Sequence, residues 1–119
     1  LVGTPLAVML MNARASVTTL NSISKDFANT CRGADIIVSG VGKAGLIRGD
    51  MVKANAIVID TGVSFPNNQM SGDAVVEEIV DHAYVTPTPG GVGPITVAKL
   101  LANTVAAAAK LHGITLPPV

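Results

Sequence analysis

The sequence predicts an α/β domain built on a doubly wound parallel sheet, and three observations support this prediction. Of its 119 residues, 49% are hydrophobic but only 3% are aromatic, and many small and β-branched side chains suit helices that pack closely on a sheet. Two short, continuously apolar runs, at 35–40 and 56–60, predict strands that are buried on both faces. Segments with helical spacing alternate with these strands, as they do in parallel sheets.

The N-terminal part of the chain predicts two helices separated by a strand. We expect a helix over 5–14, with Thr4 as its N-cap, because a proline follows at the first helical position. The short β-branched segment 16–20 predicts a strand. Ser24 is a candidate cap for a second helix that extends to about residue 32.

The rest of the chain continues the same alternation. Glycine and proline mark the connections, and apolar spacing marks the elements. We expect, in order, a strand over 35–40, a short helical crossover at 49–53, a strand over 56–60, a polar surface loop at 65–72, a short helix over 74–82, a strand over 84–86 and a long helix over 94–112.

Charge, hydropathy and cysteine content exclude several functional classes. Eight basic and eight acidic residues cancel, so no net field attracts a nucleic-acid backbone. We find no apolar run of membrane-spanning length, and a single cysteine, Cys31, builds neither a disulfide nor a Cys-based metal site. We therefore expect no nucleic-acid partner, no membrane and no bound metal.

Polar residues follow the first predicted strand at a position where ligands bind. Doubly wound sheets bind ligands beyond the carboxyl ends of their strands, and Asn21 and Ser22 lie at such an end. No Asp or Glu occurs before Lys25, so a 2′-phosphate would be tolerated there. An ordinary polar turn, with Ser24 capping the next helix, explains the same residues equally well.

Glycines and aspartates follow the next two strands. The three glycines of 40–45 would let a ligand approach the backbone, although a tight connection from strand to helix explains them nearly as well. Asp60 and Asp73 are expected to hold neighbouring loops through backbone hydrogen bonds rather than to take part in chemistry.

The most specific feature is the loop over 86–96, which precedes the long helix. Its prolines fix φ, while its glycines permit close backbone approaches. The N–H groups at the start of the helix could receive an anionic or carbonyl-rich ligand, and an elaborate turn into the helix is the simpler alternative. We expect a cis bond at Pro87 or Pro89.

Several motifs stand in a fixed order along the chain: Val2-Gly3-Thr4-Pro5, ADIIV at 34–38, GDMVK at 49–53, AIVID at 56–60, Gly72-Asp73, and the stretch 86–104. The segment PGGVGPITV at 89–97 is the most specific of them. In these motifs the chain resembles the bifunctional methylenetetrahydrofolate dehydrogenase/methenyltetrahydrofolate cyclohydrolase family. The match is to its Rossmann-like NADP-binding domain, and it extends over nearly the whole chain.

The resemblance implies an enzyme that oxidises 5,10-methylenetetrahydrofolate with NADP and hydrolyses 5,10-methenyltetrahydrofolate to 10-formyltetrahydrofolate. NAD is the alternative cofactor, because the family's Cys-His-Ser-x-Thr reads Leu-Asn-Ser-Ile-Ser at 20–24. The implied cofactor residues are Asn21, Ser22, Val41, Gly42, Gly62 and Val63. The folate side would be lined by Pro89, Gly90, Gly91, Val92, Gly93, Pro94, Ile95, Thr96 and Val97.

Family features that precede this segment are missing from the chain. The family's catalytic lysine, its partner tyrosine, its folate-binding aspartate and its first, central strand all belong to that upstream part. We therefore expect an incomplete sheet, no catalytic residue in this chain, and an inactive fragment. The helix over 94–112 should pack on the missing N-terminal domain. We further expect a cytoplasmic homodimer, with a mitochondrial location as the alternative.

Two other functions stay open on the sequence alone. The chain could be a noncatalytic dinucleotide-binding module that keeps the fold for interaction. It could also belong to an NAD-linked dehydrogenase of another small substrate.

Overall fold

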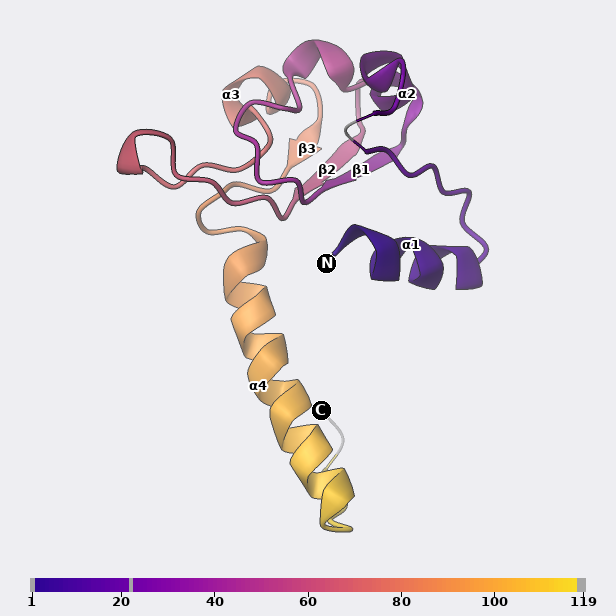
Figure 1. The fold of residues 1–119 in the computed structure, drawn as a ribbon, viewed down its shortest axis with the longest axis vertical. Coiled ribbons are helices and arrows are strands. Elements are labelled where there is room, and N and C mark those ends of the chain that lie inside the picture. Colours follow the sequence, from indigo (N-terminus) through magenta and orange to yellow (C-terminus); the bar gives the residue numbers. More distant parts are fainter. Residues whose placement is uncertain (1, 22, 118–119) are drawn as a thin grey trace.

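Three short parallel strands form the sheet of the computed structural model, which describes residues 2–21 and 23–117. They are β1 (Ile36–Ser39), β2 (Ile57–Asp60) and β3 (Tyr84–Val85), and they lie in the order β1-β2-β3 (Figure 1). All pairs are parallel. The predicted α/β fold with a parallel sheet is confirmed.

Helices lie on both sides of this sheet. They are α1 (Gly3–Asn12), α2 (Phe27–Gly33), the 3-10 helices η1 (Gly49–Met51) and η2 (Pro66–Asn68), α3 (Val76–Ile79) and α4 (Val92–Leu111). In Figure 1, α2 and α3 lie on one side of the strands, and α1 and α4 lie on the other. The crossover at 49–53, the short helix at 74–82 and the long helix at 94–112 were predicted at the places of η1, α3 and α4, whereas η2 lies in the segment 65–72 that was predicted as a polar loop.

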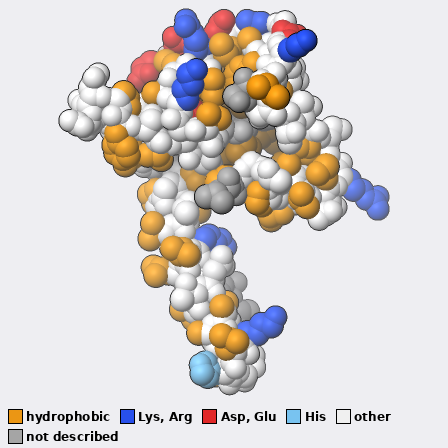
Figure 2. All heavy atoms as spheres, viewed as in Figure 1, with side chains coloured by type: hydrophobic (Ala, Val, Ile, Leu, Met, Phe, Trp, Pro, Cys, Tyr) orange, Lys and Arg blue, Asp and Glu red, His pale blue; other side chains and the backbone are white. Residues whose placement is uncertain are grey.

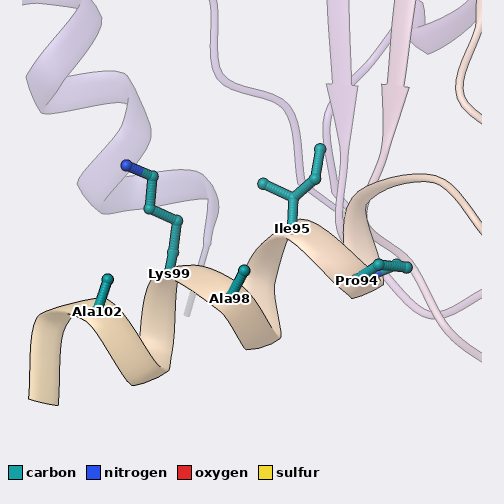
Figure 3. Close-up of a pocket in the computed structure, with 5 residues that line it drawn as sticks. All are labelled: Pro94, Ile95, Ala98, Lys99 and Ala102. Carbon is teal, nitrogen blue, oxygen red and sulfur yellow. The ribbon is translucent and has the colours of Figure 1, made fainter. Parts of the chain in front are cut away.

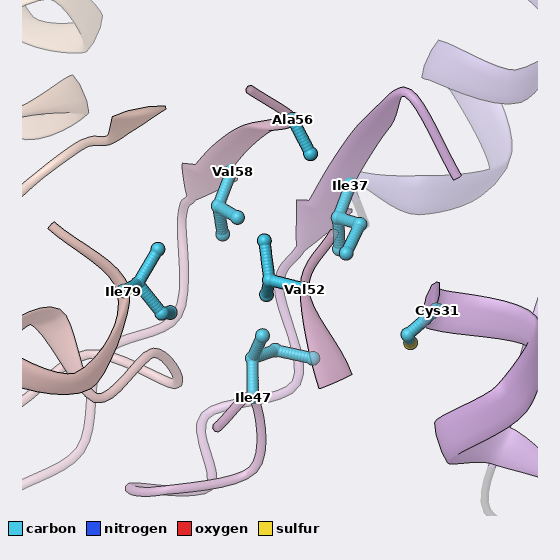
Figure 4. Close-up of a cluster of buried hydrophobic side chains, with 7 residues drawn as sticks. All are labelled: Cys31, Ile37, Ile47, Val52, Ala56, Val58 and Ile79. Carbon is cyan, nitrogen blue, oxygen red and sulfur yellow. The ribbon is translucent and has the colours of Figure 1, made fainter. Parts of the chain in front are cut away.

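The hydrophobic core lies between one face of the sheet and α2, η1 and α3. Ile37 and Val58 are paired in register and point to this face. Figure 4 shows the cluster, which comprises Cys31, Ile37, Ile47, Val52, Ala56, Val58 and Ile79. Val58 and Ile79 have no exposed surface, so this cluster supplies most of the hydrophobic stabilisation of the described structure.

The opposite face of the sheet is largely exposed, so the prediction of strands buried on both faces is wrong for this chain. Ile36, Ile57 and Tyr84 are 57%, 42% and 67% exposed. The helices on that side, α1 and α4, stand away from the strands (Figure 1). The strands are apolar as predicted, but residues 2–21 and 23–117 leave the second face largely uncovered.

The prediction of a strand at 16–20 is also wrong. Residues 15–20 belong to neither a helix nor a strand. A strand exists through hydrogen bonds with a neighbour, and among the described residues β1 pairs only with β2. Segment 16–20 therefore has the composition of a strand without a partner beside it.

Two predicted helix caps do not form. Helix α1 begins at Gly3, so Thr4 lies inside its first turn and no side chain caps it. The Ser24 hydroxyl accepts the Asn21 N–H at 2.8 Å and closes a turn, while α2 begins only at Phe27. Helix α4 begins at Val92, two residues before the predicted start.

Helix α4 projects from the body of the molecule (Figure 1). The radius of gyration is 16.7 Å, whereas a compact chain of this length has about 13.5 Å. Hydrophobic side chains are exposed along α4 and α1 (Figure 2), with Leu100 and Leu101 at 65% and 64%. The expected absence of a membrane-length segment is wrong, because α4 is long and apolar enough to cross a membrane by length and composition. Polar side chains such as Lys99 interrupt the apolar run, but the mean hydropathy of the helix stays high.

Candidate functional site

The loops that follow β1 and β2 meet at the carboxyl edge of the sheet. The N–H of Thr61 donates to the carbonyl of Ser39 at 2.7 Å, and the Thr61 hydroxyl donates to the same oxygen at 2.8 Å. Beyond these bonds, a Cβ atom on Gly42 would lie 3.2 Å from the carbonyl oxygen of Val63. Four of the predicted cofactor residues, Val41, Gly42, Gly62 and Val63, are therefore brought together.

A hairpin-like loop returns the chain to this edge. Ser64 and Ser71 exchange two backbone hydrogen bonds of 2.9 Å, which closes the polar loop predicted at 65–72. The following backbone is then fixed against Ile47, whose N–H donates to the carbonyl of Asp73 at 3.0 Å. These bonds place Gly72 and Asp73 next to the ends of β1 and β2.

The carboxylate of Asp73 is fully buried and holds the loop after β1. Its Oδ2 accepts the Ser39 hydroxyl at 2.6 Å and the Val41 N–H at 2.8 Å. Its Oδ1 accepts the Lys43 N–H at 2.7 Å. The expectation that Asp73 holds a neighbouring loop through backbone hydrogen bonds is confirmed.

The carboxylate of Asp60 holds the loop after β2 in the same way. Its carboxylate accepts the Gly62 N–H at 2.8 Å and the Ala74 N–H at 2.9 Å, and only 1% of its surface is exposed. Its own N–H donates to the hydroxyl of Thr86 at 2.9 Å. Asp60 therefore ties the loop after β2 to the segment after the hairpin and to the end of β3.

Two glycines fit against these carboxylates. A Cβ atom on Gly62 would overlap the carboxylate of Asp73, and one on Gly72 would overlap that of Asp60. Gly72 also faces Thr88, whose Cβ would lie 2.9 Å from the added atom. The loop that precedes α4 therefore reaches the same cluster.

The loop before α4 has the rigid form that its composition predicts. The Thr88–Pro89 bond is cis, as expected, and Gly90 has φ of 101°. A side chain on Gly91 would meet the carbonyl of Pro87. Pro89 and Gly90 are exposed, so this tip of the loop is open to a ligand.

The remaining predicted folate residues lie at the start of α4. Here Pro94 and Ile95 line a shallow hollow with Ala98, Lys99 and Ala102 (Figure 3). Ile95, Lys99 and Ala102 project to the same side of the helix in this view. All five lining residues belong to α4, and none belongs to the cluster around the buried aspartates.

The predicted adenosine end of the site is only partly described. Asn21 is exposed, and its side chain accepts the Ile23 N–H at 3.1 Å and the Ser24 hydroxyl at 3.2 Å. These are the bonds of a polar turn. Ser22 lies outside the described residues.

A comparison with family models assigns residues 1–112 to the tetrahydrofolate dehydrogenase/cyclohydrolase NAD(P)-binding domain. The chain belongs to this family.

Relatives of this NAD(P)-binding domain agree with the assignment. The chain is 46% identical to the bifunctional protein FolD of Jannaschia sp. (strain CCS1) over 98% of its length and 41% of the relative. It is 51% identical to the FolD of Methanosphaerula palustris over 90% of its length and 39% of that protein. The chain thus spans about two fifths of the length of the curated relatives it matches.

Solved structures in the family have the same fold. The bifunctional enzyme FolD of Campylobacter jejuni superposes with a TM-score of 0.87 at 43% identity, over 92% of this chain and 39% of that one. The enzyme of Trypanosoma brucei, complexed with NADP cofactor and inhibitor, gives 0.80 at 41% identity, over 87% and 38%. The predicted Rossmann-like fold of this NAD(P)-binding domain is therefore confirmed.

Sequence reasoning missed several residues that shape this NAD(P)-binding domain. Ser39, Thr61 and Thr86 each bind a backbone or carboxylate group at the strand ends. Ser39 and Thr61 were not predicted as site residues, and Thr86 was included only as the first residue of the loop over 86–96. Each is a polar residue at or just after the carboxyl end of an apolar strand. That position was the available signal.

Proposed function

We propose that this chain is the dinucleotide-binding part of an enzyme that oxidises 5,10-methylenetetrahydrofolate with NADP and hydrolyses 5,10-methenyltetrahydrofolate to 10-formyltetrahydrofolate. The observation that carries the proposal is the family match over residues 1–112, in register with loops that converge at the strand ends. NADP would accept the hydride that leaves the folate.

The residues at the strand ends fit a dinucleotide. Gly42 lacks a side chain beside the Val63 carbonyl, which lets the loops after β1 and β2 approach each other closely. We assign Val41, Gly42, Gly62 and Val63 to the nicotinamide end and Asn21 with Ser22 to the adenosine end. The absence of any acidic residue before Lys25 favours NADP, because a carboxylate there would repel the 2′-phosphate.

The loop and helix over 89–97 are proposed to line the folate side. Pro89 and Gly90 are exposed at the tip of a rigid loop, and Thr88 connects that loop to the cluster around Asp60 and Asp73. This arrangement orients a substrate against the cofactor. The groups that move protons are proposed to lie in an N-terminal portion of the same polypeptide.

The exposed apolar surfaces of the chain support that N-terminal portion as a partner. Helix α4 and one face of the sheet expose many large hydrophobic side chains, and large exposed apolar patches mark interaction surfaces. The matched relatives are more than twice as long as this chain. We propose that the N-terminal portion covers α4, and that the complete protein is a homodimer, as the family resemblance implies.

The proposal is tested by assaying the complete polypeptide for NADP-dependent oxidation of methylenetetrahydrofolate, followed by the absorbance of NADPH. The 119-residue chain alone is expected to show no turnover. NAD in place of NADP separates the two cofactors. A complete protein that binds dinucleotide but turns over no folate would instead be a noncatalytic module, and activity on another small substrate with NAD would identify a different dehydrogenase.

A further inference from the structure

The Asp73 carboxylate bonds to the loop after β1 on both sides of Gly42. It accepts the Val41 N–H at 2.8 Å and the Lys43 N–H at 2.7 Å, although Asp73 lies 32 and 30 residues after them in the chain. We propose that Asp73 is a positioning residue that shapes this loop for the dinucleotide. The inference rests on the proposed function.

Burying the carboxylate of Asp73 costs desolvation free energy, so a side chain that only filled space at this position would not need a charge. A buried carboxylate is stable only when its oxygens are fully bonded, and Asp73 has no exposed surface. Its three bonds go to the Ser39 hydroxyl and to two backbone N–H groups. An apolar side chain would fill the same space without the desolvation penalty, but it would leave both N–H groups of the loop unpaired.

The two bonds determine which part of the loop faces outward. With the N–H groups of Val41 and Lys43 directed to the buried carboxylate, Gly42 takes φ of 77° and lies beside the carbonyl of Val63. The Val41 side chain is left 66% exposed. A loop held in this form before the ligand arrives loses less conformational entropy on binding.

Asp73 is coupled to the second loop through its neighbours. Gly62 lies against its carboxylate, and the Ala74 N–H donates to Asp60 at 2.9 Å. A change at residue 73 therefore reaches both loops assigned to the nicotinamide end. The loop over 86–96 meets this cluster where Thr88 lies against Gly72 and where the Thr86 hydroxyl accepts the Asp60 N–H at 2.9 Å. Neither contact involves the Asp73 side chain, so folate affinity should respond less.

The test is Asp73→Asn in the complete protein. An amide keeps the volume but presents one NH2 group where the carboxylate has an acceptor, so at least one loop N–H loses its partner. Because a hydrogen bond to a charged group is stronger than one between neutral groups, we expect its loss to raise Kd and KM for NADP about tenfold or more. We expect kcat at saturating NADP and KM for the folate to change much less. A purely structural defect would instead lower kcat through a smaller active fraction and leave KM for NADP unchanged.

The matched control is Ser39→Ala, which removes the third donor to Asp73 but leaves both loop N–H groups paired. It should leave the Kd for NADP near that of the unchanged protein. Amide hydrogen exchange of the unchanged protein without cofactor provides a readout that needs no variant: Val41 and Lys43 should be protected. Unchanged NADP affinity in Asp73→Asn, or free exchange at these two amides, would overturn the inference. Absence of any folate oxidation by the unchanged protein would count against the proposed function instead, because Kd and exchange can still be measured.

Discussion

Gly62 lies so close to the buried carboxylate of Asp73 that its backbone leaves no room for a side chain. The contact joins residues from two different connections, one after β2 and one after the hairpin-like loop. Asp60 and Gly72 make the reciprocal contact. Each glycine therefore sits against the carboxylate of the other segment, and the two segments are fixed as a unit.

Gly62→Ala is expected to destabilise the protein. The added methyl group would have to displace Asp73 or the loop, and overpacking of this kind costs about 1–3 kcal/mol. The measurement is the free energy of unfolding in urea. The control is Gly33→Ala, because nothing lies within 4 Å of an added Cβ there, and this change should be close to neutral. Equal stability of the two variants would contradict the overlap.

Ile79→Ala should remove a substantial part of the core. The side chain has no exposed surface and packs in the cluster between the sheet, η1 and α3. Truncation of a buried isoleucine costs about 2–5 kcal/mol. Thermal or urea unfolding measures the loss, and Ile23→Ala provides the control because that side chain is 85% exposed. A loss at residue 79 no larger than at residue 23 would show that the cluster is not the core.

Lys53 should control the titration of Asp35. The Lys53 ammonium hydrogen-bonds to the Asp35 carboxylate at 2.6 Å, and this bond, with the attraction between the charges, lowers the pKa of Asp35. Because the folded pKa is the lower one, any stabilisation is present above the unfolded pKa and is lost as the pH falls through the folded value. NMR titration should show the pKa of Asp35 rise in Lys53→Met. The effect on stability should be small because the pair is exposed to solvent.

Cys31 should react slowly in the native protein. Burial raises the pKa of the Cys31 thiol, and the side chain is only 4% exposed. Because the thiolate is the reactive form, alkylation near neutral pH should be slow until the protein unfolds. Mass spectrometry after iodoacetamide treatment, with and without denaturant, measures the difference. Native labelling as fast as in denaturant would mean that Cys31 is not buried in the core cluster.

The positions of β1 and β2 followed from the sequence because their signals are local. Continuous runs of Ile and Val predicted them to within a residue at each end. The rigid loop before α4 was equally accessible, since proline and glycine restrict the backbone wherever they stand. The role of Asp60 and Asp73 as acceptors for backbone N–H groups was also visible from their places after strands and turns.

The tertiary structure decided what depends on distant partners. Segment 16–20 has the composition of a strand but forms none, because a strand requires a neighbour that supplies hydrogen bonds. Burial of Ile36 and Ile57 depends on a layer that α1 and α4 do not provide within this chain. The pairing of Asp73 with Val41 and Lys43, and its fit against Gly62, join segments that only folding brings together. The sequence by itself determined most of the elements and their polar ends, and the packing of the loops determined which of those ends meet.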